Sequence, residues 1–283
     1  MILHSLLQKV HLNKSLYIIH FTLYILLSTS QAQTYLLPSE NIFKPITSNY
    51  FEPRIGLAYY PKTGYFKVDA GKSYDLILFK FNKSNFSFGT EFFMHALGLN
   101  IKEKRLPIDV ADGYFGINFS FSDSSSSNRL RLRILHNSAH FVDGHSERNL
   151  TYQPKENYVN DFFDITFQKH ITKNLNLFTI VNYPIIIHPK ELHKVNLSIG
   201  FEILHKFIDS FWNNENNFFI TYNIKLTPLP KYIGTNHLMT GIRFGNGSSP
   251  KVKIYFSFYN GENLFKQYYG LKVSEYSFGF YIE

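Results

Sequence analysis

Apolar and polar residues alternate along most of the chain, in segments separated by stretches rich in Asn, Asp, Gly, Ser and Pro. Successive side chains of a β-strand point to opposite faces, so a period of two predicts strands rather than helices. Pro184 falls within one segment and fits only a strand end or a bulge. We expect about twelve strands, near residues 54–60, 73–81, 86–95, 113–121, 129–140, 158–168, 175–184, 194–206, 217–226, 237–244, 251–259 and 274–282.

The strand lengths and connections favour a membrane barrel over a soluble sandwich. Soluble strands average about five to six residues, whereas outer-membrane strands need about 9–11, with an apolar outer face and a polar lumen. The connections alternate between short ones, such as 82–85 and 122–128, and longer ones, such as 61–72 and 96–112. Short periplasmic turns and long extracellular loops produce this pattern. The sequence therefore predicts an all-β fold, a transmembrane antiparallel β-barrel of about 12 strands over residues 54–283.

Composition supports this fold class. The chain has 283 residues, of which 18% are aromatic, including 29 Phe and 20 Tyr, as expected for aromatic girdles at both membrane interfaces. It contains no cysteine, which excludes disulfides and thiolate metal sites. The net charge of +8 is spread without a Lys/Arg run, which favours solvated and lumen-facing charge, and no nucleic-acid partner is expected.

The first 32 residues have the features of a secretory signal peptide. Lys9 and Lys14 precede an apolar run at 16–27, and small residues follow it. An N-terminal membrane anchor is the alternative, but the run is shorter than the roughly 20 residues that span a bilayer. After residues 1–32 we expect an N-terminal periplasmic segment at 33–53. The predicted location is the bacterial outer membrane, with its lipids, its lipopolysaccharide and the outer-membrane assembly machinery as partners.

The strand at 129–140 carries the most informative polar residues. His136, Ser138 and His140 continue the row of apolar side chains that faces lipid, at the extracellular end of the strand. A histidine two residues from a serine on one face lies within side-chain reach, so His136 could deprotonate Ser138 for attack on an ester. Asp161, on the outward row of the next strand, is the candidate that would orient His136.

Other interpretations of these residues remain open. Asp143 competes with Asp161 as the orienting acid, and His140 and Asp143 are candidate auxiliaries. A metal site formed by His136, His140 and Asp143 is a further alternative. Polar residues at a barrel rim are also tolerated in the headgroup zone without any function.

A second polar row belongs to the opposite face of the same strand. Arg129, Arg131 and Arg133 should face the lumen, where confined cations need partners. Glu91 and Glu202 lie on polar faces that could supply them. The alternatives are a filled, ion-paired lumen and a narrow anion pore lined by the arginines.

Several segments resemble a family of bacterial outer-membrane proteins of unknown function. The resemblance extends in order over roughly residues 40–283, implies the barrel fold and the outer membrane, and assigns no activity. Its segments are FKPI at 43–46, FEPR at 51–54, LPIDVADGYFG at 106–116, RLR at 131–133, HNSAH at 136–140, DG at 143–144, YNG at 259–261 and QYY at 267–269.

The H-x-S pattern of His136 and Ser138 is similar to a strand motif of outer-membrane phospholipase A and the lipid A deacylase. Ala139 stands where both enzymes have asparagine. The resemblance implies a lipid-directed serine acyl hydrolase, with calcium as a cofactor in that case only; otherwise no cofactor is expected. The sequence predicts a non-enzymatic barrel with a structural role or a narrow channel, and the hydrolase is the alternative.

Overall fold

The computed structural model describes residues 33–99, 106–123, 125–148, 157–211, 214–228, 231–245 and 250–283. The predicted signal peptide, residues 1–32, lies outside this part of the chain. Among the described residues, no helix is long and apolar enough to cross a bilayer.

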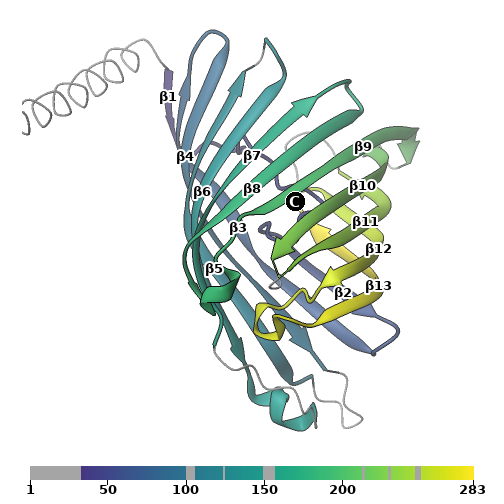
Figure 1. Ribbon diagram of the computed structural model, residues 1–283. Coiled ribbons are helices and arrows are strands. Elements are labelled where there is room, and N and C mark those ends of the chain that lie inside the picture. Colours follow the sequence, from purple (N-terminus) through teal and green to yellow (C-terminus); the bar gives the residue numbers. More distant parts are fainter. Residues whose placement is uncertain are drawn as a thin grey trace, which may run out of the picture.

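Twelve of the thirteen strands form a closed antiparallel ring (Figure 1). Each strand pairs with its neighbours in sequence, and β13 closes the ring by pairing with β2. A short strand, β1, adds to the periplasmic end of β3. The bounds are β1 Gln33–Leu36, β2 Ile55–Tyr60, β3 Tyr65–Lys80, β4 Ser84–Gly98, β5 Ile108–Asp123, β6 Asn128–Phe141, β7 Val159–His170, β8 Leu175–His188, β9 Asn196–Phe211, β10 Asn214–Pro228, β11 Tyr232–Phe244, β12 Val252–Glu262 and β13 Lys272–Ile282, with 3₁₀ turns η1 Asp143–Arg148, η2 Lys190–Leu192 and η3 Lys266–Tyr268.

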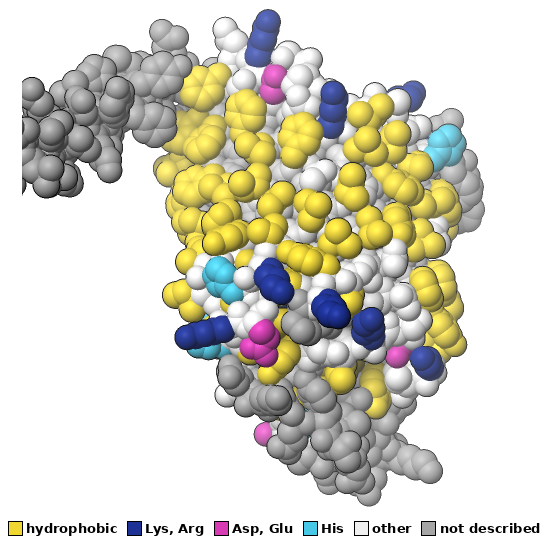
Figure 2. All heavy atoms as spheres, in the orientation of Figure 1, with side chains coloured by type: hydrophobic (Ala, Val, Ile, Leu, Met, Phe, Trp, Pro, Cys, Tyr) yellow, Lys and Arg dark blue, Asp and Glu magenta, His cyan; other side chains and the backbone are white. Residues whose placement is uncertain are grey.

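The predicted 12-strand antiparallel β-barrel is confirmed. Alternation along each strand places apolar side chains outside, where they form a continuous band (Figure 2). The band includes Leu57, Phe92, Phe115, Leu130, Ile165, Ile199, Ile254 and Phe278. The buried inner face carries small and polar groups, among them Ser87, Asn118, Thr166, Ser198, Thr221 and Ser277. An outer apolar surface of this size is stable only in contact with lipid.

Aromatic rings lie at both ends of the barrel. Near the periplasmic ends of their strands, Phe86 and Phe119 have centroids 6.4 Å apart. At the opposite end, Tyr59 and Phe66 flank the β2–β3 turn with centroids 5.0 Å apart. Aromatic side chains tolerate the boundary between lipid and water, so the two sets are suited to the two interfaces.

The structure corrects the predicted loop at 61–72. A tight turn joins β2 to β3, which begins at Tyr65. The charges of Lys67 and Asp69 made this stretch resemble a loop, but both side chains are buried in the lumen, where they pair with each other. Asp69 also contacts Nδ1 of His95 at 2.6 Å. At Pro184, the structure has a β-bulge in the β7–β8 pairing, as proline requires.

The chain before β2 fills the lumen. We call residues 43–54 the plug, because most of its side chains are buried and its partners lie on strands around the ring. The hydroxyl of Ser48 lies 2.7 Å from that of Thr221 on β10, and its carbonyl accepts a hydrogen bond from His237 on β11 at 2.9 Å. The sequence predicted a periplasmic segment at 33–53, but the structure places its second half inside the barrel. Its polar groups complement those of the lumen, which no alternation pattern reveals.

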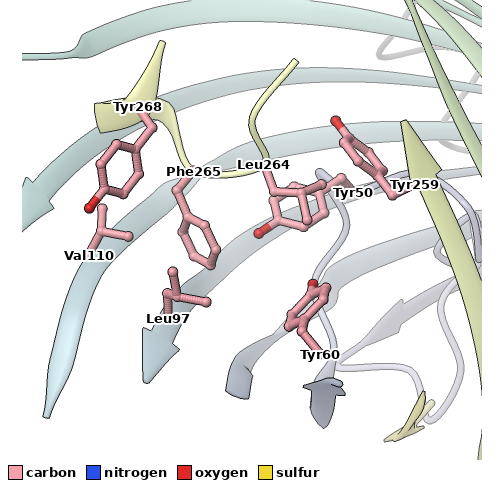
Figure 3. Packing of buried hydrophobic residues seen from close by; sticks show 8 residues of the cluster. All are labelled: Tyr50, Tyr60, Leu97, Val110, Tyr259, Leu264, Phe265 and Tyr268. Carbon is pink, nitrogen blue, oxygen red and sulfur yellow. The ribbon is translucent and has the colours of Figure 1, made fainter. Parts of the chain in front are cut away.

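A second element closes the extracellular mouth. The β12–β13 loop folds inward, so that the Phe265 ring lies 6.4 Å from that of Tyr50 in the plug, and Leu264 and Tyr268 belong to the same cluster (Figure 3). Val110 of β5 belongs to the same cluster. Apolar packing therefore joins the plug, the barrel wall and this loop.

Candidate functional site

The outward polar row of β6 lies where its alternation predicts. Leu130 and Ile134 are exposed on the outer face, while the alternate Arg131, Arg133 and Leu135 are buried. His136 and Ser138 are partly exposed, and His140 is exposed, on the lipid-facing parity. Because β6 leads into the connection that contains η1, these three residues lie at the extracellular end of the outer surface.

His136 and Asp161 are brought together across two strands. They are direct partners in the β6–β7 register, and Nδ1 of His136 lies 2.5 Å from Oδ1 of Asp161. The two side chains remain 32% and 39% exposed, so both are accessible from the outer face. A carboxylate on Nδ1 fixes the orientation of the ring and leaves Nε2 free to meet another group.

Ser138 is hydrogen-bonded to the other histidine. Its Oγ lies 2.6 Å from Nε2 of His140, on the same strand and face. The sequence predicted a contact between Ser138 and His136. In the structure Ser138 contacts His140, and His136 contacts Asp161. Strand periodicity could not choose between the two histidines, because both lie two residues from the serine.

The space next to Ser138 is open on one side. Its register partner on β5 is Gly113, and a methyl group added there would meet only the Ser138 carbonyl oxygen, at 3.9 Å. Its partner on β7 is Val159. On the other flank, the Phe115 ring lies 4.9 Å from that of His136. Ser138 thus lies beside a glycine on β5 and has a histidine on either side of it along its own strand.

The described residues near Ser138 include no cluster of acidic and histidine side chains for a metal ion. Among the described residues, no three acidic or histidine side chains are grouped to hold a metal ion. His136, His140 and Asp143 therefore form no such group, and Asp161 is engaged by His136.

Two of the three lumen arginines are neutralised by ion pairs. Arg131 contacts both carboxylate oxygens of Glu52 in the plug, at 2.9 and 2.5 Å. Arg133 binds both oxygens of Asp164 on β7 and lies 3.3 Å from Glu91 on β4. All of these side chains are buried, and a fork of two parallel bonds is the strongest arrangement of an arginine with a carboxylate.

The remaining predicted lumen residues lie nearer the periplasmic mouth. Arg129 is half-buried and lines a cavity there with Glu202. Glu202 is not a partner of the arginine row. It accepts a hydrogen bond from the Thr47 amide of the plug at 2.7 Å and another from Asn176 at 3.2 Å.

The plug carboxylate Glu52 was not among the predicted site residues. Burial raises the pKa of Glu52, but the guanidinium groups of Arg131 and Arg133 outweigh it, so the pKa lies below its usual value. Asp164 was also missed, although it is on the inward parity of β7 directly opposite Arg133 and a register argument could have found it. Strand register could not have identified Glu52 as a partner of the arginines, because Glu52 lies outside every strand.

Comparisons with known proteins support the fold. No protein-family model matches the sequence, and no curated protein does. Among solved structures, the outer membrane phospholipase A from Escherichia coli is similar, with a TM-score of 0.53 and 9% identity over 87% of this chain and 95% of that chain. The KdgM porin also matches, with a TM-score of 0.42 and 7% identity over 81% of this chain and 99% of that chain. The β domain of the Bordetella autotransporter BrkA matches with a TM-score of 0.42 and 8% identity over 82% of this chain and 98% of that chain.

The closed ring, the lipid-facing band and the similarity in fold to the phospholipase structure agree. The protein is a bacterial outer-membrane β-barrel. Its apolar outer surface therefore contacts membrane lipid, and the β6 row lies on that surface.

Proposed function

We propose that the barrel is a lipid-directed serine acyl hydrolase, with Ser138 as nucleophile. The observation that carries this proposal is the 2.6 Å contact between Ser138 Oγ and His140 Nε2 on the lipid-facing surface. A hydroxyl is a weak nucleophile unless a base within hydrogen-bonding distance takes its proton. Its outward position also makes Ser138 accessible to an acyl ester of a membrane lipid.

The reaction would be ester hydrolysis through an acyl-enzyme. Ser138 Oγ attacks the acyl carbonyl carbon while its proton passes to His140 Nε2. The tetrahedral intermediate then collapses, the carbon–oxygen bond to the alcohol breaks, and His140 returns the proton to that alcohol. Water, deprotonated by the same imidazole, releases the fatty acid and restores Ser138.

The His136–Asp161 pair would stabilise the negative oxygen of the intermediate. When both ring nitrogens carry protons, Nδ1–H donates to Asp161 and Nε2–H is left for the carbonyl oxygen. Backbone amides near Ser138 are engaged in the ladders with β5 and β7, so a side-chain donor is needed for this task. In the alternative triad predicted from the sequence, His136 would be the base and Asp161 its orienting group.

The proposal is tested by acyl-chain release from phospholipid and lipopolysaccharide in detergent micelles, with and without calcium. The wild-type protein should release fatty acid, and Ser138→Ala should reduce release to background. Ser126→Ala, in the periplasmic β5–β6 turn, is the matched control and should be as active as wild type. Absence of release by a wild-type protein that shows the heat-modifiable mobility of a folded barrel would refute the proposal.

A closed barrel with a structural role is the second candidate. It is supported by the buried plug, which leaves a cavity of about 50 Å³ near Asn49 and Asp164 and one of about 160 Å³ near Arg129 and Glu202. The paired arginines also argue against an open anion pore. In planar bilayers the wild-type barrel should remain closed, and steady anion conductance would favour the channel.

A further inference from the structure

Basic side chains gather beside the β6 row, at the extracellular border of the apolar band. We call His188, Lys190, His193, Lys194 and Lys231 the basic belt; all five are exposed. Figure 2 shows Lys, Arg and His side chains along the lower border of the apolar band. Exposed Glu191 is the acid within this stretch.

The strand register connects the basic belt to the candidate nucleophile. Ser138 pairs with Val159 on β7, and Val159 pairs with His188 on β8. His188 therefore lies two strands from Ser138 on the outer face, a separation of about 10 Å at the usual strand spacing. A single lipid headgroup can span this distance.

The turn that carries most of the belt is held in place. Leu192 of η2 is buried with Ala139 of β6, Tyr158 and Ile187, which anchors the turn to the barrel mouth. The His193 ring packs edge-on against lipid-facing Tyr183, at 5.6 Å. Because Leu192 points inward, its neighbours in the turn remain on the outer surface.

A hydrogen bond brings the last lysine to the same place. The hydroxyl of Tyr232, which follows Lys231, donates to the carbonyl of Val195 at 2.9 Å, and Val195 follows Lys194. The two lysines thus come from different hairpins, β8–β9 and β10–β11, and lie at one rim. Lysines at this level attract anionic headgroups with a free energy of about 1 kcal/mol each, which corresponds to about five-fold in affinity.

We propose that the basic belt binds the phosphate groups of a phosphorylated glycolipid of the outer leaflet and presents its acyl esters to Ser138. The role as a substrate site rests on the hydrolase proposed above; the binding does not. The lysines of the belt contact phosphate, and the histidines add donors nearer the β6 row. Lipopolysaccharide carries both phosphates and acyl esters on its sugar, so one molecule can reach both the basic belt and Ser138.

Binding is measured in the Ser138→Ala background, so that no turnover disturbs it. The detergent-solubilised barrel is mixed with purified lipopolysaccharide, the same material after dephosphorylation, or phosphatidylglycerol, and bound lipid is counted by native mass spectrometry. Phosphorylated lipopolysaccharide should bind more tightly than the dephosphorylated form, by on the order of 100-fold for three lysines. The triple variant K190Q/K194Q/K231Q should lose this preference.

The matched control is K83Q/K169Q/K173Q, which removes three lysines at the opposite end of the barrel and should retain the preference. Equal binding of both forms of lipopolysaccharide, an unchanged preference in the belt variant, or equally strong binding of phosphatidylglycerol or of free inorganic phosphate as a competitor would overturn the inference. Binding as expected, with no hydrolysis by the wild type, would refute the hydrolase and leave the belt as a lipid-binding site. Hydrolysis of phospholipid without selective binding would refute the belt alone.

Discussion

Ser138 and His140 form a hydrogen bond between two alternate residues of one strand, on the face that contacts lipid. The outward face of β6 changes along the strand from the apolar Leu130, Leu132 and Ile134 to the polar His136, Ser138 and His140. The pair gives the serine a base, and the nearby His136–Asp161 contact gives a candidate oxyanion donor. The two histidines therefore have different expected roles, which mutation can separate.

His140→Ala should lower acyl release to the level of Ser138→Ala, because it removes the group that accepts the serine proton. His136→Ala should lower it by about 10²–10³-fold, the usual loss for one oxyanion donor. His136→Gln, which retains an N–H donor, should keep more activity than His136→Ala. The measurement is fatty-acid release by folded, detergent-solubilised variants. Loss of all activity in His136→Ala with substantial activity in His140→Ala would instead support the triad of Ser138, His136 and Asp161.

Gly113→Val should block the site without harming the fold. A side chain at position 113 enters the open space beside Ser138, and its Cβ would meet no atom closer than 3.9 Å. We expect loss of lipid hydrolysis with little change in the temperature at which the barrel loses its heat-modifiable mobility. Gly116→Val is the opposite control, because its Cβ would lie 2.0 Å from the Ile134 carbonyl oxygen and should disturb the β5–β6 pairing. Full activity in Gly113→Val would contradict the proposed approach of the lipid.

Glu52→Gln should loosen the plug. It leaves the buried guanidinium of Arg131 without its carboxylate, and breaking a buried pair in this way costs about 3–5 kcal/mol. We expect easier proteolysis within residues 43–54 and intermittent conductance in planar bilayers. Glu40→Gln, at an exposed acid before the plug, should behave as wild type. A Glu52→Gln barrel as closed and protease-resistant as wild type would show that the ion pair does not hold the plug.

Acid should have the same effect on the wild-type plug. The pKa of Glu52 is held below its ordinary value by Arg131 and Arg133 despite burial, so the carboxylate is charged in the folded state to lower pH than in the unfolded chain. Its stabilisation is fully present above the unfolded pKa of about 4.5 and is lost as the pH falls through the lowered value. Protease resistance of the plug should therefore fall at acidic pH in the wild type, whereas Glu52→Gln should lack this part of the dependence. Parallel curves for the two proteins would assign the transition to other groups.

The strands, and which of their side chains point to lipid or to the lumen, could be predicted from the sequence, because the alternation of apolar and polar residues is a local pattern. The outward position of His136 and Ser138 followed from the parity set by Leu130 and Ile134. Lys67 and Asp69 were assigned to a loop although they lie in β3. In the sequence, charged residues that face a filled lumen look the same as charged residues in a loop. Contacts across the lumen, such as Arg131 with Glu52, join residues 79 positions apart and depend on how the plug enters the barrel. The choice of His140 over His136 depends on side-chain rotation, which periodicity does not determine.

The nucleophilic character of Ser138 is the central claim, and reaction with a lipid-like fluorophosphonate tests it most directly. Attack by an activated serine forms a phosphorus–oxygen bond, releases fluoride and adds the probe to one peptide, which mass spectrometry identifies. We predict labelling at Ser138 in the folded wild-type barrel, greatly slowed in His140→Ala and absent in Ser138→Ala. A folded wild-type barrel that is not labelled at Ser138 would contradict the claim and leave the β6 row as a polar rim.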